Sequence, residues 1–220
     1  MRQFDSAGVE ERLLSELYDF HDKLILEIGC GTGRLTKMIK RDSTAIIAVD
    51  QDASRVSIAR QNLPGVVFLK ATLPELSFPA YAFDLVLFSM SLHHMEDEDK
   101  ILAALQTAAS FGKEVLVVEP SIDSDVTALV NLFGPETAII CSAKRVLAYF
   151  QKQLRLRRKV TIETQWKFDC LLELFDYFWG KNDSQEVMEN RNQVRRFLGR
   201  TEKEDSNPLI LVDKINYYLF

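Results

Sequence analysis

Cysteine is scarce in this sequence of 220 residues, which contains only Cys30, Cys141 and Cys170. An odd number of widely spaced cysteines fits neither a disulfide framework nor a zinc site. We therefore expect reduced, mostly buried thiols and no bound metal.

Long apolar runs, glycine and proline are also sparse. No apolar run approaches the ~18 residues that span a bilayer, and the first residues lack the apolar stretch of a signal peptide. Nine glycines and six prolines are too few for a collagen-like or low-complexity chain. With 47% hydrophobic residues, the chain can bury a sizeable core without disulfide or metal staples. These features predict one cytoplasmic domain over residues 1–220, without a membrane span.

An excess of basic charge is absent, since the net charge is −5. This disfavours general nucleic-acid binding, DNA included. Basic side chains nevertheless gather in residues 141–160, which contain no acidic residue. They are Lys144, Arg145, Lys152, Arg155, Arg157, Arg158 and Lys159. A local anion-facing patch stays open as an interpretation of this basic segment.

Short apolar runs alternate with segments of helical periodicity. We predict strands at residues 24–28, 44–50, 66–69, 83–88, 114–119, 159–166 and 208–219. We predict helices at residues 9–20, 33–41, 53–62, 96–110 and 143–156, and in two pieces over 170–198. This alternation indicates an α/β, Rossmann-like, doubly wound fold, with a mostly parallel seven-stranded sheet and helices on both faces. Residues 1–22 form an N-terminal helical segment, and residues 168–206 a helical insertion before the last strand.

A glycine-rich loop follows the first predicted strand and reads Glu27-Ile28-Gly29-Cys30-Gly31-Thr32-Gly33. Glycines allow a sharp turn and a close approach of the backbone to a ligand. A dinucleotide fingerprint would place its third glycine at position 34, where this chain has Arg34. The pattern E-x-G-x-G-x-G instead resembles the first motif of class I S-adenosylmethionine-dependent methyltransferases. The resemblance implies S-adenosylmethionine as cofactor, its methionine end held by Glu27, Gly29, Cys30, Gly31 and Gly33.

The second and third predicted strands end at the remaining cofactor positions. Asp50 lies where these methyltransferases have a ribose-binding acid, next to Gln51, and a carboxylate accepts two hydrogen bonds from a vicinal diol. Asp52 suits the N-cap of the following helix better. Thr72 stands where many family members place an adenine-binding aspartate, and the backbone of Leu73 is a second adenine contact.

The segment after the fourth strand contains Leu92-His93-His94. It resembles a stretch of small-molecule methyltransferases of the ubiquinone/menaquinone-biosynthesis type, which implies that Phe88 and Ser89 border the sulfonium. His93 or His94 is a candidate catalytic base, because histidine titrates near neutral pH, or else packs at a helix start. The base-gripping Asn/Asp-Pro-Pro-Tyr/Phe and Pro-Cys motifs of DNA methyltransferases are missing. The acidic run 96–99 complements a helix dipole rather than holding a metal with these histidines.

The insertion opens with an aromatic segment, 168–179, which is a substrate lid, a homodimer face or ordinary core. Farther on, Arg191 and Arg195 share a helix face and either grip an anion or lie in solvent.

The leading interpretation is a methyltransferase that acts on a small molecule by in-line displacement. The alternatives are a protein or tRNA methyltransferase that docks through the basic segment, a non-catalytic cofactor-binding regulatory protein and a nicotinamide oxidoreductase.

Overall fold

The computed structural model describes residues 2–4, 8–41, 44–95, 97–179 and 184–220. The strands are β1 (Arg2–Phe4), β2 (Leu24–Ile28), β3 (Ala45–Asp50), β4 (Val67–Lys70), β5 (Phe83–Ser89), β6 (Gly112–Pro120), β7 (Arg158–Phe168) and β8 (Leu209–Leu219). The α-helices are α1 (Val9–Leu17), α2 (Arg34–Ile39), α3 (Ala53–Asn62), α4 (Glu98–Phe111), α5 (Asp125–Val130), α6 (Glu136–Phe150), α7 (Leu171–Trp179) and α8 (Gln185–Leu198). Three 3-10 helices cover η1 (Leu73–Glu75), η2 (Leu92–His94) and η3 (Glu202–Glu204).

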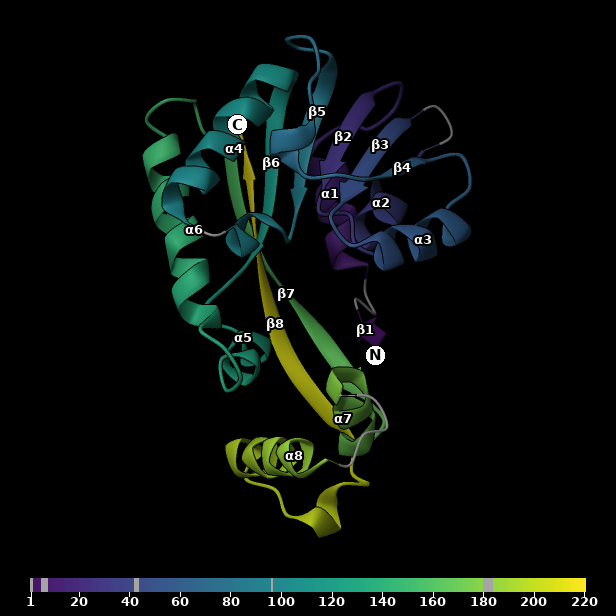
Figure 1. Ribbon diagram of the computed structural model, residues 1–220, viewed down its shortest axis with the longest axis vertical. Coiled ribbons are helices and arrows are strands. Elements are labelled where there is room, and N and C mark those ends of the chain that lie inside the picture. The colour runs from purple at the N-terminus through teal and green to yellow at the C-terminus, as the bar shows by residue number, and fades with distance from the viewer. Residues whose placement is uncertain (1, 5–7, 42–43, 96, 180–183) are drawn as a thin grey trace.

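The eight strands of the described residues form one sheet in the order β1-β7-β8-β6-β5-β2-β3-β4 (Figure 1). Strands β4, β3, β2, β5 and β6 run parallel, whereas β8 is antiparallel to both β6 and β7. The predicted Rossmann-like α/β fold is confirmed, but the sheet is mixed rather than mostly parallel. Helices α5 and α6 carry the chain from β6 to β7, and β8 then returns between those two strands.

The strand that we did not predict is β1, which lies inside the N-terminal segment that we predicted to be helical. Its three residues are too short for any periodicity to show, and pairing with the far end of β7 gives them their extended form. Helix α1 follows as predicted. In the insertion, α7 and α8 match the two predicted helical pieces, and residues 180–183 between them lie outside the described residues.

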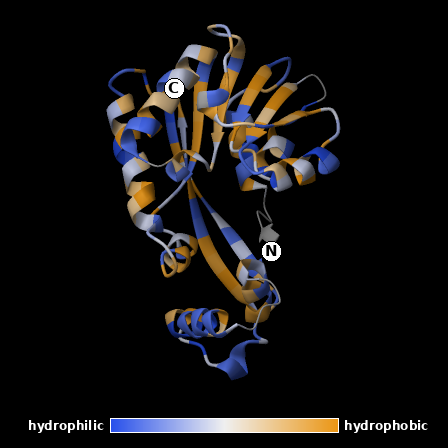
Figure 2. Cartoon of the chain, viewed as in Figure 1, coloured by the Kyte–Doolittle hydropathy of each residue, from blue (hydrophilic) through white to orange (hydrophobic). Residues whose placement is uncertain are grey.

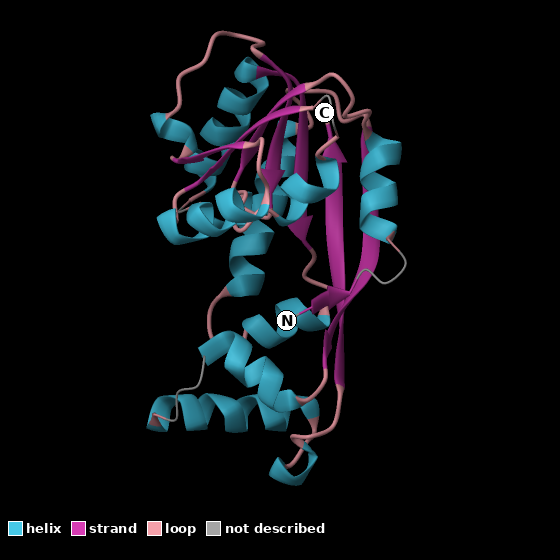
Figure 3. Ribbon diagram, turned by 90° about the vertical axis from the view of Figure 1, so that its right-hand side faces the viewer, coloured by secondary structure: helices cyan, strands magenta, loops and turns pink. Residues whose placement is uncertain are grey.

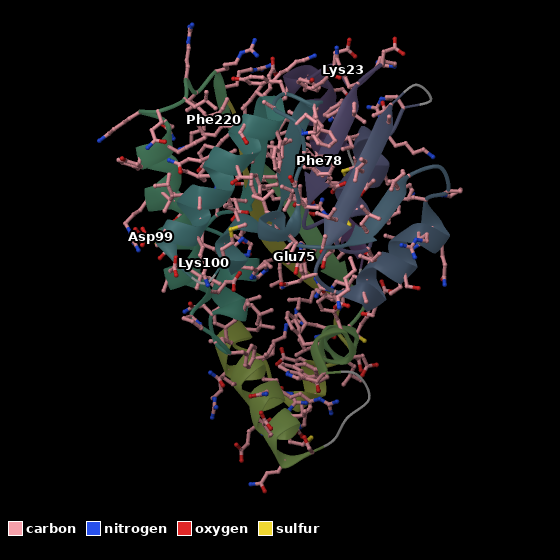
Figure 4. All side chains as sticks on the ribbon, turned by 45° about the horizontal axis from the view of Figure 1, so that its top comes forward. Lys23, Glu75, Phe78, Asp99, Lys100 and Phe220 are labelled. Atoms are coloured by element: carbon pink, nitrogen blue, oxygen red, sulfur yellow. The ribbon has the colours of Figure 1, made fainter. Side chains whose placement is uncertain are left out.

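Helices cover both faces of the sheet, as the side view shows (Figure 3). One hydrophobic core lies between the sheet and α1, α2 and α3. A second core lies on the opposite face under α4 and α6, where Phe220 packs on Phe150 with ring centroids 5.2 Å apart (Phe220 is labelled in Figure 4). Hydrophobic residues therefore concentrate on the central strands, while α8 is mostly hydrophilic (Figure 2).

The carboxyl ends of the parallel strands share one edge of the sheet. The glycine loop and the segments after β3, β4, β5 and β6 all leave from this edge. Strands β7 and β8 continue past it to α7 and α8 (Figure 1). In α/β folds this edge is where ligands bind.

Candidate functional site

The glycine loop has a backbone that only glycine adopts easily. Gly29, Gly31 and Gly33 have φ angles of 76°, 55° and 89°, in the left-handed region. A Cβ atom at Gly29 would lie 2.1 Å from the Cβ of Ser91. The amides of Gly29 and Cys30 donate to the carbonyl of Val49 at 2.8 and 3.0 Å, which ties the loop to the end of β3.

Cys30 fills space beneath this loop. Its side chain is 3% exposed, and burial raises the pKa of the thiol. The thiol is therefore neutral and packs in the core with α1 and α2. Cys141 and Cys170 are partly exposed free thiols.

Asp50 connects the glycine loop with the start of α3. Its Oδ2 accepts the Gly31 amide at 2.8 Å, and its Oδ1 accepts the Asp52 amide at 2.9 Å. An ionised carboxylate offers about four acceptor sites, so two remain for a ligand diol. Asp52 caps α3 through the Ser54 amide at 2.8 Å, as predicted. Gln51 is exposed and stands at the edge of this site.

Glu27 lies beneath the glycine loop and is fully buried. Its Oε2 accepts from the Thr36 hydroxyl at 2.5 Å, whereas Oε1 has no hydrogen-bond partner among the described residues. Burial raises the pKa of Glu27 to about 7. A buried carboxylate oxygen without a partner calls for an external donor.

The remaining cofactor candidates contribute mainly through backbone atoms. Thr72 is half-buried, and its amide donates to Glu75 Oε2 at 3.1 Å. The Leu73 side chain is 2% exposed and belongs to the core, so only its backbone can contact an adenine ring. The Phe88 side chain is also wholly buried, whereas Ser89 ends β5 at the ligand edge.

The turn after β5 carries a strained residue that the sequence does not reveal. Met90 has a φ of 52°, which is uncommon for a residue other than glycine, and its amide donates to the Val118 carbonyl at 2.9 Å. The following Ser91 donates its hydroxyl to the Ile28 carbonyl at 2.9 Å. This turn is therefore locked against the glycine loop on one side and β6 on the other.

His93 is held by a buried carboxylate. Its Nδ1 lies 2.6 Å from Oε2 of Glu119, and both side chains are 4% exposed. Glu119 also accepts the amides of Leu92 and His93 at 2.9 and 3.3 Å. Nε2 of His93 lies 3.8 Å from Oε1 of Glu136. Burial alone lowers the pKa of His93, but the two carboxylates outweigh it, so the net pKa is raised above 6.5.

The pKa values of the two histidines are shifted in opposite directions. Burial and the neighbouring His93, with ring centroids 4.0 Å apart, lower the pKa of His94 to about 4. His94 is neutral at pH 7, whereas the carboxylate of Glu119 favours the charged form of His93. The sequence pattern did not distinguish these two roles.

This arrangement predicts a pH dependence of stability. Because the folded state raises the pKa of His93, its contribution is complete below pH 6.5 and is lost as pH rises through the folded pKa. We expect the free energy of unfolding to fall above pH 6.5, by up to ~1.4 kcal/mol for each pH unit between the unfolded and folded pKa values. Urea unfolding between pH 6 and 9 measures this, and His93→Gln should flatten the curve. Parallel curves for the two proteins would contradict the assignment.

The acidic run before α4 is structural. Asp97 caps the helix by accepting the Lys100 amide at 2.8 Å, and Asp99 and Lys100 lie on the exposed first turn (Figure 4). Glu96 lies outside the described residues. Over the described ranges, no three His, Cys, Asp or Glu residues gather as metal ligands would.

The basic segment 141–160 is dispersed over α6 and β7. Arg145 pairs with Glu98, Arg157 pairs with Glu114, and Lys159 lies 5.1 Å from the ring centroid of Tyr218. Arg158 donates to the carbonyl of Glu16 at 2.7 Å. These four side chains are therefore engaged at different places of the chain.

The helical insertion forms a third core with α5 and the ends of β7 and β8. Leu171, Leu174 and Phe175 are buried in it, while Tyr177 stays 45% exposed. Arg195 makes a bidentate pair with Asp205, with distances of 3.0 and 2.5 Å. Arg195 is thus a structural residue rather than a free anion ligand. Among the described residues, no helix is long and apolar enough to cross a bilayer.

The first strands and helices match a known protein family. Residues 25–113 match a family model described as a methyltransferase domain. An uncharacterized methyltransferase of Oceanobacillus iheyensis is 30% identical over 111 residues, which cover 49% of this chain and 51% of that protein. A ubiquinone/menaquinone biosynthesis C-methyltransferase of Vibrio campbellii is 32% identical over 104 residues, covering 43% of this chain and 40% of that protein. The chain thus spans about half or less of these curated relatives.

Solved structures extend the similarity of fold to nearly the whole chain. A putative methyltransferase from Bacillus halodurans has a TM-score of 0.64 at 11% identity, covering 96% of this chain and 98% of that one. The YcgJ protein from Bacillus subtilis has a TM-score of 0.59 at 17% identity, covering 95% of this chain and 96% of that one. At these identities the likeness concerns the fold alone. It includes β7, β8 and the insertion, which the family model does not reach.

Proposed function

We propose, from the premise that residues 25–113 form a class I S-adenosylmethionine-dependent methyltransferase domain, that the chain transfers a methyl group to a small molecule. The observation that carries this is the pair of unused carboxylate positions at the glycine loop. Within the part of the chain that the structure describes, Glu27 has a buried oxygen without a hydrogen-bond partner, and Asp50 has two acceptor sites left. These positions suit an ammonium group and a ribose diol that belong to one ligand.

S-adenosylmethionine, when bound, supplies an activated methyl group on a sulfonium. Glu27 holds the ammonium of the methionine end, and Gly29, Gly31 and Gly33 let the backbone approach it. Asp50 holds the ribose, with Gln51 beside it, and Thr72 and the Leu73 backbone face the adenine. Ser89, with the backbone of Phe88, borders the reacting end of the site.

The chain's main task in the transfer is alignment and exclusion of water, because the methyl group is already activated. The Glu119–His93 pair fixes the turn after β5 in place. His94, the other candidate base, is neutral beside it, and its pKa of about 4 makes it a weak proton acceptor at pH 7. His93 is in this proposal a positioning residue.

A small-molecule acceptor is supported by three observations. The base-gripping motifs of DNA methyltransferases are absent from the sequence. Four of the seven basic side chains of residues 141–160 make contacts within the chain. The relative from Vibrio campbellii is named for quinone biosynthesis.

Asp50→Ala tests the cofactor site. Loss of hydrogen bonds from a charged group, about 1.5–3 kcal/mol, should weaken S-adenosylhomocysteine binding roughly 10- to 100-fold. Isothermal titration calorimetry measures it, and Asp52→Ala, which removes only the cap of α3, is the matched control. Binding of NADH with no binding of S-adenosylhomocysteine would overturn the proposal.

An assay of methyl transfer distinguishes an enzyme from a regulatory protein that only binds the cofactor. We expect tritium from methyl-labelled S-adenosylmethionine to appear in a small-molecule fraction of a metabolite extract. A flat dependence of the rate on salt would argue against tRNA as acceptor, because phosphate contacts make binding fall steeply with salt. Cofactor binding without any transfer would support the regulatory alternative.

A further inference from the structure

The β7–β8 hairpin places an acidic side chain just beyond the ligand edge of the sheet. Strand β6 ends at Pro120, which pairs with Ile215, and β8 continues two residues farther to Asp213. Side chains alternate between the faces of a strand. Ile215 and Tyr217 lie in the core beneath α1, α2 and α3, so Asp213 is on that same face.

Asp213 is 4% exposed and only partly satisfied by its neighbours. Its Oδ1 accepts from the Ser124 hydroxyl at 3.0 Å, and its Oδ2 accepts from Nε1 of Trp166 at 3.1 Å. About two of the four acceptor sites of an ionised carboxylate therefore remain. Burial raises the pKa of Asp213, as expected for a desolvated acid.

Thr164 lies opposite Asp213 in the register of the hairpin. Its side chain is 4% exposed, and its hydroxyl has no hydrogen-bond partner among the described residues. Paired residues of this kind have their Cβ atoms about 4.5–5.5 Å apart. Free acceptor sites and an unpartnered hydroxyl thus meet at one buried position.

This position is coupled to the end of the glycine loop. The charge of Arg34, the first residue of α2, lowers the pKa of Asp213, and that of Glu10 raises it. Glu10 is fully buried and accepts from Nη1 of Arg34 and from the Tyr217 hydroxyl, both at 2.5 Å. The N-terminal helix, the glycine-loop helix and β8 are therefore joined by one polar chain.

Aromatic side chains border the same position. Tyr177 of α7 packs edge-on against Trp166, with ring centroids 5.8 Å apart. Burial raises the pKa of the Tyr177 hydroxyl, and Arg55 of α3 lowers it by a smaller amount. A ligand here meets ring surfaces around one acidic group.

We propose that Asp213 and Thr164 form the acceptor-binding wall of the site, and that the methyl acceptor is an aromatic molecule bearing a hydroxyl or amino group. The inference rests on the proposed methyltransferase function. Asp213 accepts a hydrogen bond from the O–H or N–H group. As the oxygen or nitrogen forms its bond to the methyl carbon, the carbon–sulfur bond breaks with its electron pair left on sulfur, and the proton moves to the Asp213 carboxylate. Thr164 supplies the second hydrogen bond to the same ligand group.

The test measures probe binding to the full chain saturated with S-adenosylhomocysteine. Phenol and benzylamine are the donor-bearing probes, and anisole, whose oxygen already carries a methyl group, is the comparison. By NMR titration we expect phenol or benzylamine to bind at least about tenfold more tightly than anisole. Asp213→Asn should weaken that binding about tenfold or more, while S-adenosylhomocysteine affinity changes less than about twofold.

Thr164→Val keeps the side-chain shape and removes the hydroxyl, so this variant is expected to fold. It should weaken probe binding about three- to tenfold. Glu163→Gln alters the exposed opposite face of the same strand and serves as the control. If S-adenosylhomocysteine binds but both site variants bind the probes like wild type, or no donor-bearing probe binds, the acceptor wall is wrong. If S-adenosylhomocysteine itself does not bind, the proposed function fails instead.

Discussion

Replacing Glu119 by glutamine is expected to lower the free energy of unfolding by about 3–5 kcal/mol, the usual cost of leaving one member of a buried ion pair alone. Glu119 accepts hydrogen bonds from the side chain of His93 and from two backbone amides in a region closed to solvent. The amide group of glutamine offers a donor where His93 also donates. Urea unfolding at pH 6, where His93 is charged, measures the effect.

Glu136→Gln is the matched control, because Glu136 lies farther from His93, at 3.8 Å, and is more exposed. Its effect should be well under half as large. The double variant His93→Gln/Glu119→Gln should recover part of the loss, since no buried charge is left alone. Equal losses for Glu119→Gln and Glu136→Gln would refute the assigned pairing.

Gly29→Ala is expected to weaken S-adenosylhomocysteine binding by more than about 100-fold, or ~2.7 kcal/mol. The new methyl group would meet the Cβ of Ser91 at 2.1 Å, and the residue must also hold a φ of 76°. Neither the loop nor the turn after β5 can move without breaking the bond from Ser91 to Ile28. Calorimetry measures the affinity, and urea unfolding measures the accompanying loss of stability.

Gly31→Ala separates the effect of backbone strain from the effect of a steric clash. A Cβ at Gly31 meets nothing within 4 Å, so only the left-handed backbone, with a φ of 55°, is penalised. We expect this variant to lose about 1–2 kcal/mol of stability. Ser91→Gly in the Gly29→Ala background should restore part of the binding. A Gly29→Ala protein with wild-type affinity would show that the loop is far more pliable than its contacts indicate.

The parts of the site that follow directly from the sequence are local. The glycine loop, Asp50 and Asp52 each act within a strand–turn–helix unit, so the residues that define them are neighbours in the chain. Glu119 and Asp213 were missed because their partners are distant in sequence. His93 lies 26 residues from Glu119, and Trp166 lies 47 residues from Asp213.

The prediction of the fold from the sequence meets the same limit, since it succeeds for local patterns and fails for pairings between distant segments. Alternating apolar and helical segments predicted the parallel strands from β2 to β6, whose connections are short. The direction of β7 and β8 depends on which edge the last strand enters, and no periodicity records that choice. The three residues of β1 take their extended form from pairing with β7 alone.

The position of β8 between β6 and β7 dictates the order of events during synthesis. Each of β3, β4, β5 and β6 pairs with a strand that precedes it in the chain, whereas β7 is joined to β6 only through β8, which follows both. Until β8 has been synthesised, β7 cannot join the sheet beside β6, and the edge of β6 lacks the hydrogen-bond partners that β8 and Phe220 supply, such as the carbonyl that accepts the Val115 amide. Such an edge is a template for association between chains. Nascent-chain quality control is therefore most needed in the interval between the synthesis of β6 and that of β8.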